Sequence, residues 1–197
     1  MRRVSVLGGS CSGKTTVSRQ LAAILGVPHV ELDALHHGPN WTEAPAELLQ
    51  ERVHAALAAA PEGWVVDGTY YGKLGSLVLE QADTAVFLDP TFGRAVWRSL
   101  WRTFSRAVTR AELWNGNRET FRTAFSRYSI PIWVLRTHHS QRRKWPARLE
   151  AHPQLEVVRL HSPREIGGWL QSIQATETTS GSSNGSELQK TPPLRER

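Results

Sequence analysis

The sequence predicts an α/β fold in which helices cover both faces of a parallel sheet. Short apolar, β-branched runs alternate along the chain with segments of helical spacing, and this alternation is typical of parallel strands joined by helical crossovers. A polar residue or loop follows each expected strand, at the edge where parallel sheets bind ligands. A chain of 197 residues is long enough for one domain with its own core.

The strands are expected where β-branched and apolar residues run together, and the helices where apolar residues recur every three or four positions. The expected strands are residues 3–7, 29–32, 64–66, 84–88 and 155–160. The expected helices are residues 14–25, 45–60, 73–81, 91–111, 119–133, 137–151 and 163–173.

Two segments are expected to be less ordered than the rest. Residues 112–128 contain a polar loop tip, ELWNGNR, and are expected to belong to a mobile lid. From residue 175 the chain is rich in Thr, Ser and Gly and has almost no apolar content, which predicts a disordered tail. The expected domain is therefore 1–174 and the expected tail 175–197.

Residues 8–15 read GGSCSGKT, a complete G-x-x-x-x-G-K-T phosphate-binding loop. It lies between an expected strand and an expected helix, where backbone N–H groups and the helix dipole hold phosphate oxygens. Lys14 would reach the β- and γ-phosphates, and Thr15 would supply a hydroxyl to Mg²⁺. We therefore expect ATP and Mg²⁺ as cofactors, bound by Gly8, Gly9, Ser10, Cys11, Ser12, Gly13, Lys14 and Thr15.

Two carboxylates follow the next expected strands of the sheet. Asp67 ends the run WVVDG, and in phosphate-loop proteins such an Asp holds Mg²⁺, usually through water; a turn-forming Asp-Gly pair is the alternative. Asp33 would bind an acceptor hydroxyl and take its proton, or steady Mg²⁺; a cap for the next segment is the alternative. For Glu31 the functional and the capping interpretations are equally supported.

His36, His37 and Trp41 come soon after Asp33. The adjacent histidines lack the i, i+4 spacing that is typical of a zinc site. A loop that binds the acceptor against an aromatic wall is therefore favoured over a metal centre.

Arginines recur every four residues in the expected helix 91–111, at Arg94, Arg98, Arg102, Arg106 and Arg110. Like charges at this spacing repel one another, so acidic partners or bound phosphates should offset them. Arginines can also stabilise the charge on a phosphoryl group in transfer; for any single Arg, a solvated surface charge is the alternative. The same helix carries an apolar row that is expected to face the core: Trp97, Trp101, Phe104 and Val108.

The composition limits which partners and which cellular location are expected. A net charge of +6 suits a polyphosphate substrate as well as nucleic acid. The only cysteine, Cys11, excludes an internal disulfide and is expected to be a small filler of the phosphate loop, with an oxidation-sensitive thiol as the alternative. No run of 18 apolar residues and no signal-peptide pattern occurs, so a soluble, cytoplasmic protein is expected.

The order of the motifs resembles the adenylate-kinase-related P-loop kinases that are often labelled DNA topology modulation proteins. The resemblance spans residues 2–170 and includes the stretches LDALHHGPNW, WVVDG, VFLDP, GNRE, IPIWVLRTHHSQRR and VVRLHSPREIGGWL. It implies a P-loop NTPase fold of the nucleoside-monophosphate-kinase type with strand order 2-3-1-4-5, ATP, Mg²⁺ and an Arg-bearing lid. It also implies phosphate binding by Gly13, Lys14, Thr15 and Thr16, acceptor contact by Asp33, a Mg²⁺-linked carboxylate at Asp67, and phosphate clamping by Arg98 and Arg102.

One departure bears on the acceptor. Adenylate kinases proper follow this Asp-Gly pair with Phe-Pro-Arg, whose arginine binds the AMP phosphate. Here Thr69-Tyr70-Tyr71 follows, which argues against AMP as the acceptor.

The sequence thus predicts an ATP-dependent kinase that phosphorylates a nucleotide or another small hydroxylated or phosphorylated acceptor. Its expected catalytic residues are Lys14, Asp33, Arg98 and Arg102. The alternative is an ATP-binding regulator associated with nucleic acid, although the chain has no helix-turn-helix, zinc-finger or RNA-binding signature.

Overall fold

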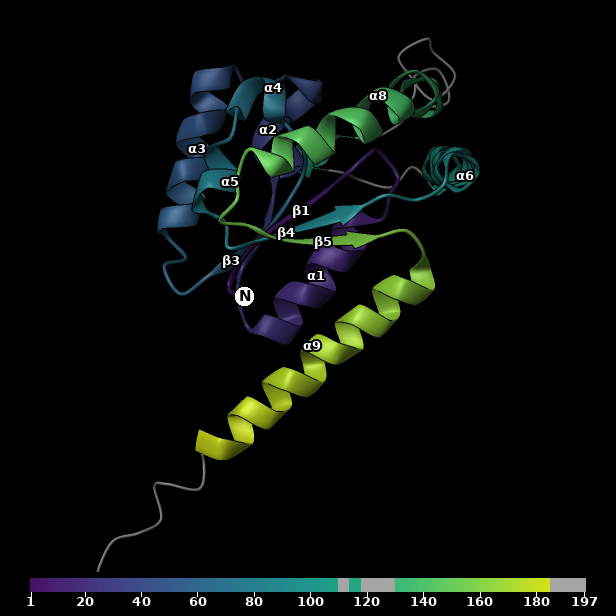
Figure 1. Cartoon of the computed structure of the whole chain (residues 1–197). Coiled ribbons are helices and arrows are strands. Elements are labelled where there is room, and N and C mark those ends of the chain that lie inside the picture. The colour runs from purple at the N-terminus through teal and green to yellow at the C-terminus, as the bar shows by residue number, and fades with distance from the viewer. Residues whose placement is uncertain (110–113, 118–129, 185–197) are drawn as a thin grey trace, which may run out of the picture.

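The computed structural model describes residues 1–109, 114–117 and 130–184. Within them a parallel sheet has the strand order β2-β3-β1-β4-β5, as predicted (Figure 1). The strands are β1 (Arg3–Gly8), β2 (His29–Glu31), β3 (Trp64–Asp67), β4 (Thr84–Leu88) and β5 (Glu156–Leu160). The middle strands read as continuous apolar runs because both of their faces are buried.

Helices cover the two faces of the sheet as separate layers (Figure 1). One face carries α1 (Lys14–Leu25) and α9 (Pro163–Asn184). The other carries α3 (Ala46–Ala58), α4 (Tyr71–Leu74), α5 (Leu77–Gln81) and α8 (Ile130–Glu150). The remaining elements are α2 (Leu32–His36), η1 (Pro39–Trp41), α6 (Phe92–Thr109) and η2 (Trp114–Gly116).

Each face of the sheet has its own apolar core. Beneath α1 and α9, strand and helix residues pack together, among them Val4, Val86, Leu21 and Leu170. The opposite core is larger and includes Trp64, Phe87, Leu49 and Trp145. None of the helices in the described part of the chain combines the length and the apolar composition that crossing a lipid bilayer requires.

Several boundaries differ from those expected. β2 ends at Glu31 because Leu32 begins a short helix, so Asp33 lies in the first turn of α2 and not at a strand end. The expected helix 73–81 is two short helices, α4 and α5, separated at Gly75, whose φ of 57° is left-handed. α8 is continuous across residues 134–136, where a break was expected.

The ends of the expected lid and tail also differ. α9 continues to Asn184, so residues 175–184 of the expected tail are helical, while 185–197 lie outside the described residues. Of the expected lid, 112–128, only residues 114–117 are described.

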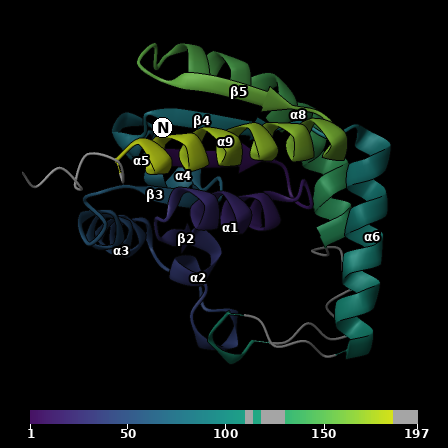
Figure 2. The ribbon, with the colours of Figure 1, turned by 90° about the horizontal axis from the view of Figure 1, so that it is seen from below.

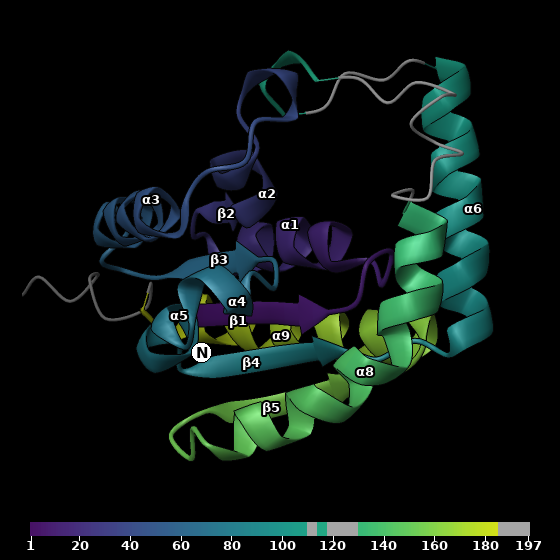
Figure 3. The same ribbon diagram turned by 90° about the horizontal axis from the view of Figure 1, so that it is seen from above.

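The apolar row of α6 faces away from the protein, which overturns the expectation that it would face the core. We call the exposed set the α6 stripe: Trp97 (67% exposed), Leu100 (49%), Trp101 (63%), Phe104 (55%) and Val108 (57%). The buried side of α6 instead presents the small residues Ala95, Ser99 and Thr103, and the helix lies against α8 (Figures 2 and 3). Small side chains let the two helices approach closely, so they determine which side turns inward.

Candidate active site

The phosphate loop joins β1 to α1 at the carboxyl edge of the sheet. Gly13 has a φ of 99°, a conformation that side chains rarely adopt, and a Cβ there would lie 3.2 Å from Nη1 of Arg98. Cys11 is also left-handed, with a φ of 62°. The loop is closed by a turn in which Ser12 N–H donates to the Gly9 carbonyl at 3.3 Å. This backbone, with α1 beginning at Lys14, is the arrangement that binds anions.

Lys14 is the cation at the centre of the loop. Its Nζ donates to the Gly9 carbonyl at 2.9 Å. Burial lowers the pKa of the Lys14 ammonium, although the carboxylates of Asp67 and Asp33 favour its charged form. The hydroxyl of Ser12 is buried nearby and has no hydrogen-bond partner. The buried Lys14 ammonium and the unpartnered Ser12 hydroxyl could both donate hydrogen bonds to a phosphate group.

Asp67 is held by the sheet itself. It is the last residue of β3, is 4% exposed, and pairs in register with Val6 on one side and Glu31 on the other. Its carboxylate accepts a hydrogen bond from the Thr15 side chain. Burial raises the pKa of Asp67, and the nearby Lys14 opposes that shift.

The pairing of a hydroxyl and a carboxylate fits Mg²⁺, which keeps several waters and takes few protein ligands. Thr15 and Asp67 are the residues that would hold it. Among the described residues, no group of three or more His, Cys, Asp or Glu side chains gathers where it could hold a metal. The His36–His37 pair belongs to no such group in this part of the chain.

Asp33 is held by a residue that the sequence did not single out. The Tyr70 hydroxyl donates to Asp33 Oδ1 at 2.6 Å and lies 3.3 Å from His37 Nε2. Burial and the Asp33 charge raise the pKa of Tyr70, so its hydroxyl remains protonated and a donor. From the sequence, Tyr70 was notable only as part of the Thr-Tyr-Tyr run that departs from the adenylate-kinase pattern, and no contact with Asp33 was predicted for it.

The two adjacent histidines have different environments. His36 is 2% exposed, and its Nε2 lies 3.4 Å from Glu43 Oε2. Burial lowers the pKa of His36, which keeps the ring neutral. His37 instead joins an aromatic wall, with ring centroids 5.5 Å from Trp41 and 6.0 Å from Trp114. Aromatic rings thus gather where the acceptor-binding wall was expected, and the His36 ring adjoins them, with its centroid 4.7 Å from His37 and 4.4 Å from Tyr70.

Residues 114–117 dock onto the loop that follows α2. The buried Asn117 accepts a hydrogen bond from Trp41 N–H at 2.9 Å and donates to the Gly38 carbonyl at 2.9 Å. Asn115 donates to the His37 carbonyl. The sequence predicted only a loop tip here, because no local pattern shows that these side-chain amides form hydrogen bonds with backbone groups far away in the chain.

The arginines that recur every four residues along α6 differ in their surroundings. Arg98 donates from Nη1 to the Ser12 carbonyl at 3.1 Å. The charge of Arg102 acts on Lys14, which places it near the loop as well. Arg94 is exposed and acts on Glu165. Arg110 lies outside the described residues.

Glu31, the third carboxylate of this region, forms an ion pair with an exposed arginine. Its Oε2 lies 3.4 Å from Nη2 of Arg19 on α1. The pair ties the end of β2 to the neighbouring helix. Glu31 is the N-cap residue of α2, but its side chain makes no capping hydrogen bond there, and its charge acts on Asp67.

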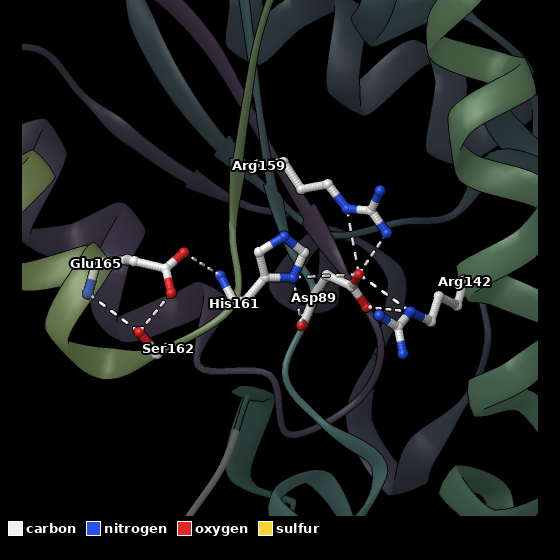
Figure 4. Close-up of polar contacts among 6 residues, drawn as sticks. All are labelled: Asp89, Arg142, Arg159, His161, Ser162 and Glu165. Carbon is white, nitrogen blue, oxygen red and sulfur yellow. Dashed lines mark hydrogen bonds and ion pairs between the residues drawn. The ribbon is translucent and has the colours of Figure 1, made fainter.

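Asp89, which follows β4, forms the ion-pair cluster drawn in Figure 4. Its buried carboxylate accepts from Arg159 Nη2 at 2.5 Å and from Arg142 Nε at 3.1 Å, and His161 Nδ1 lies 3.5 Å away. Arg142 belongs to α8, so the cluster fastens α8 to the ends of β4 and β5.

A cavity of about 190 Å³ lies beside the phosphate loop. One wall comes from α6 and the other from the segment after β5, with Leu88 and Ser12 between them. The lining is mostly apolar and includes Trp97, Arg98, Pro163 and Ile166. Sequence reasoning did not find this cavity, because its walls lie far apart in the chain.

No family model and no curated protein matches the chain. Two of the solved structures that are similar to it match over nine-tenths or more of the chain. A gluconokinase from Sinorhizobium meliloti 1021 is 19% identical, with a TM-score of 0.51 over 95% of this chain and 97% of that one. A shikimate kinase from Acinetobacter baumannii, in complex with shikimate, is 16% identical, with a TM-score of 0.54 over 91% and 94%.

Likeness at these identities shows the fold, so this chain has the fold of the P-loop kinases. The predicted resemblance to DNA topology modulation proteins is not shown by these comparisons. A nucleic-acid partner is not supported by them either.

Proposed function

We propose that this protein is an ATP-dependent kinase that phosphorylates a small hydroxylated acceptor. The observation that carries the proposal is the grouping of Lys14, Asp67 and Asp33 at one edge of the sheet, where both carboxylates act on the lysine charge. The two similar structures are kinases by name. The acceptor class stays broad: a nucleotide or another hydroxylated or phosphorylated small molecule.

ATP and Mg²⁺ would be held by the phosphate loop, by the end of β3 and by the walls of the neighbouring cavity. The loop from Gly8 to Thr16 would bind the phosphates, with Thr15 and Asp67 at the metal. The cavity between Trp97 and Pro163 has a mostly apolar lining, which would suit the nucleobase. When bound, ATP supplies the phosphoryl group and Mg²⁺ offsets its negative charge.

Asp33 would act on the acceptor. Its carboxylate can accept the proton of an acceptor hydroxyl, which makes the oxygen a better nucleophile. Tyr70 fixes the direction of that carboxylate by donating to Oδ1. The free oxygen, Oδ2, is then available to the acceptor.

Arg98 and Arg102 would stabilise the charge that develops during transfer. Both belong to α6 and lie near the phosphate loop, where fixed cations lower the energy of a negatively charged transition state. Because these two arginines turn toward the loop, they favour the kinase over a regulator that binds nucleic acid along α6.

The test is a screen of ATP consumption against nucleoside monophosphates, nucleosides and hydroxylated metabolites, with Lys14→Ala beside the wild type. Lys14→Ala should abolish turnover, because Lys14 would contact the phosphates; Lys144→Ala, which changes an exposed lysine of α8, is the matched control. Turnover in a folded Lys14→Ala protein equal to that of the control would refute the proposal.

The two carboxylates are separated by two further variants. Asp67→Asn should raise the Mg²⁺ concentration needed for every acceptor, because it removes charge beside the metal. Asp33→Asn should spare ATP binding and lower kcat by about 10²- to 10⁴-fold if Asp33 is the general base. A neutral Asp33→Asn would show that the acceptor is activated elsewhere.

A further inference from the structure

α6 is an amphipathic helix with its apolar side turned to solvent. Its inner side is occupied by small residues against α8, and by Arg98 at the phosphate loop. Its outer side is the α6 stripe, in which every member is about half exposed or more. Contiguous apolar surface of this kind marks an interaction site, because exposing it to water is unfavourable. No described residue of the chain buries it.

The spacing of the α6 stripe is that of a helix-pairing seam. Trp97, Trp101, Phe104 and Val108 follow one another at intervals of four, three and four residues, which is the a/d repeat of helices that pack side by side. Leu100 widens the seam on one flank. A seam of this kind is self-complementary, so two copies of the same helix can cover each other about a twofold axis.

The exposed area is sufficient for a dimer. With aromatic side chains of 150–250 Å² each, the α6 stripe exposes roughly 600 Å² of apolar side-chain surface. Pairing two copies would bury up to about 1,200 Å² from these side chains, with Trp97 shared between the stripe and the cavity wall, which reaches the lower end of stable protein–protein interfaces.

The charges favour a protein partner over a lipid surface. Helices that lie on anionic membranes carry cations on the polar flanks of the apolar side. Here Arg98, although exposed, is bonded to the phosphate loop, and Arg102 acts on Lys14. The exposed Arg94 acts on Glu165, and Arg106 is partly buried and has an interaction partner. The seam itself contains no charged residue, so two copies can meet without repulsion between like charges.

We propose that two copies of this chain associate through the α6 stripe, helix against helix. The association brings the outer sides of two α6 helices together and leaves their arginine-bearing sides at the two active sites. It does not depend on the proposed kinase activity, because it follows from the exposed seam alone.

The experiment is sedimentation velocity on the full-length protein at about 1 to 100 µM, a range suited to an interface of this size. The wild type should shift from monomer to dimer with rising concentration. Trp101→Glu and Phe104→Glu should each raise the dimer dissociation constant by about 30-fold or more, as expected for central aromatic residues. Trp97 is left unchanged because it also lines the cavity.

Leu48→Glu is the matched control, since Leu48 is an exposed apolar residue of α3 outside the α6 stripe. It should dimerise as the wild type does, and circular dichroism and Tm should show that all three variants are folded. A wild type that stays monomeric throughout, or a dimer that survives both α6 variants, overturns the proposal. So does a monomer that cosediments with phosphatidylcholine–phosphatidylserine vesicles, which would assign the α6 stripe to a membrane.

Discussion

Replacing Tyr70 with Phe is expected to lower kcat for phosphoryl transfer about tenfold and to leave the KM for ATP unchanged. The substitution removes one oxygen atom, which in the structure donates to Asp33 Oδ1 at 2.6 Å. Without that bond the Asp33 carboxylate can rotate away from the acceptor, while the phosphate loop keeps its geometry. The effect should therefore appear in transfer and not in nucleotide binding.

The magnitude follows from the environment of the bond. A hydrogen bond to a charged group contributes about 1.5–3 kcal/mol, and the lower end applies because Tyr70 is only partly buried. A change of about 1.4 kcal/mol in the barrier is tenfold in rate. The free energy of unfolding should fall by only about 1 kcal/mol at the same time, because one hydrogen bond is lost while the ring stays in place.

The neighbouring Tyr71 provides the control. Its ring packs beneath the Arg148 guanidinium, 3.9 Å from ring centroid to Cζ, and against Trp145. Tyr71→Phe keeps the ring and should leave kcat unchanged. Initial rates at saturating ATP, with the acceptor varied, separate kcat from KM for both variants. If Tyr70→Phe keeps the wild-type kcat, Tyr70 does not position the catalytic carboxylate.

Three further outcomes are expected. Arg98→Ala should lower kcat on the order of 10²-fold with little change in Tm, whereas Arg164→Ala on α9, the exposed control, should change neither. Burial lowers the pKa of His36, so its contribution to stability is present above about pH 6.5 and is lost as pH falls through the lowered pKa; Tm should fall from about pH 7.5 to 5.5, less steeply in His36→Gln. Asp89→Asn should cost about 2 kcal/mol in urea denaturation, below the 3–5 kcal/mol of fully buried pairs, because its arginines are nearly half exposed.

The elements with local signals were predicted closely. The phosphate-loop motif predicts the strand before it and the helix after it, because its glycines and its lysine bind phosphate only in that position. α1 has the predicted bounds, 14–25, and β4 has the predicted bounds, 84–88. The strand order came from a resemblance to a family and is confirmed by the pairing of the strands.

The parts that were missed depend on contacts between distant residues. Amphipathic spacing in α6 identifies an apolar side but does not say what lies opposite it, and the small residues Ala95 and Ser99 turned out to face α8. The bond from Tyr70 to Asp33 joins residues far apart in sequence, which meet only because β2 and β3 are neighbours. Asn117 likewise has no local signal for its role, since its partners lie on the loop after α2.

The two halves of the candidate site are built in different ways, and the difference bears on specificity. The donor half rests on the sheet, where Asp67 is fixed by pairing on both sides and the phosphate loop continues directly from β1. The acceptor half rests on the short helix α2 and on side-chain hydrogen bonds from Tyr70 and Asn117. Short elements held by side chains can change without disturbing the sheet, so under the proposed function the acceptor half is the part that would set specificity.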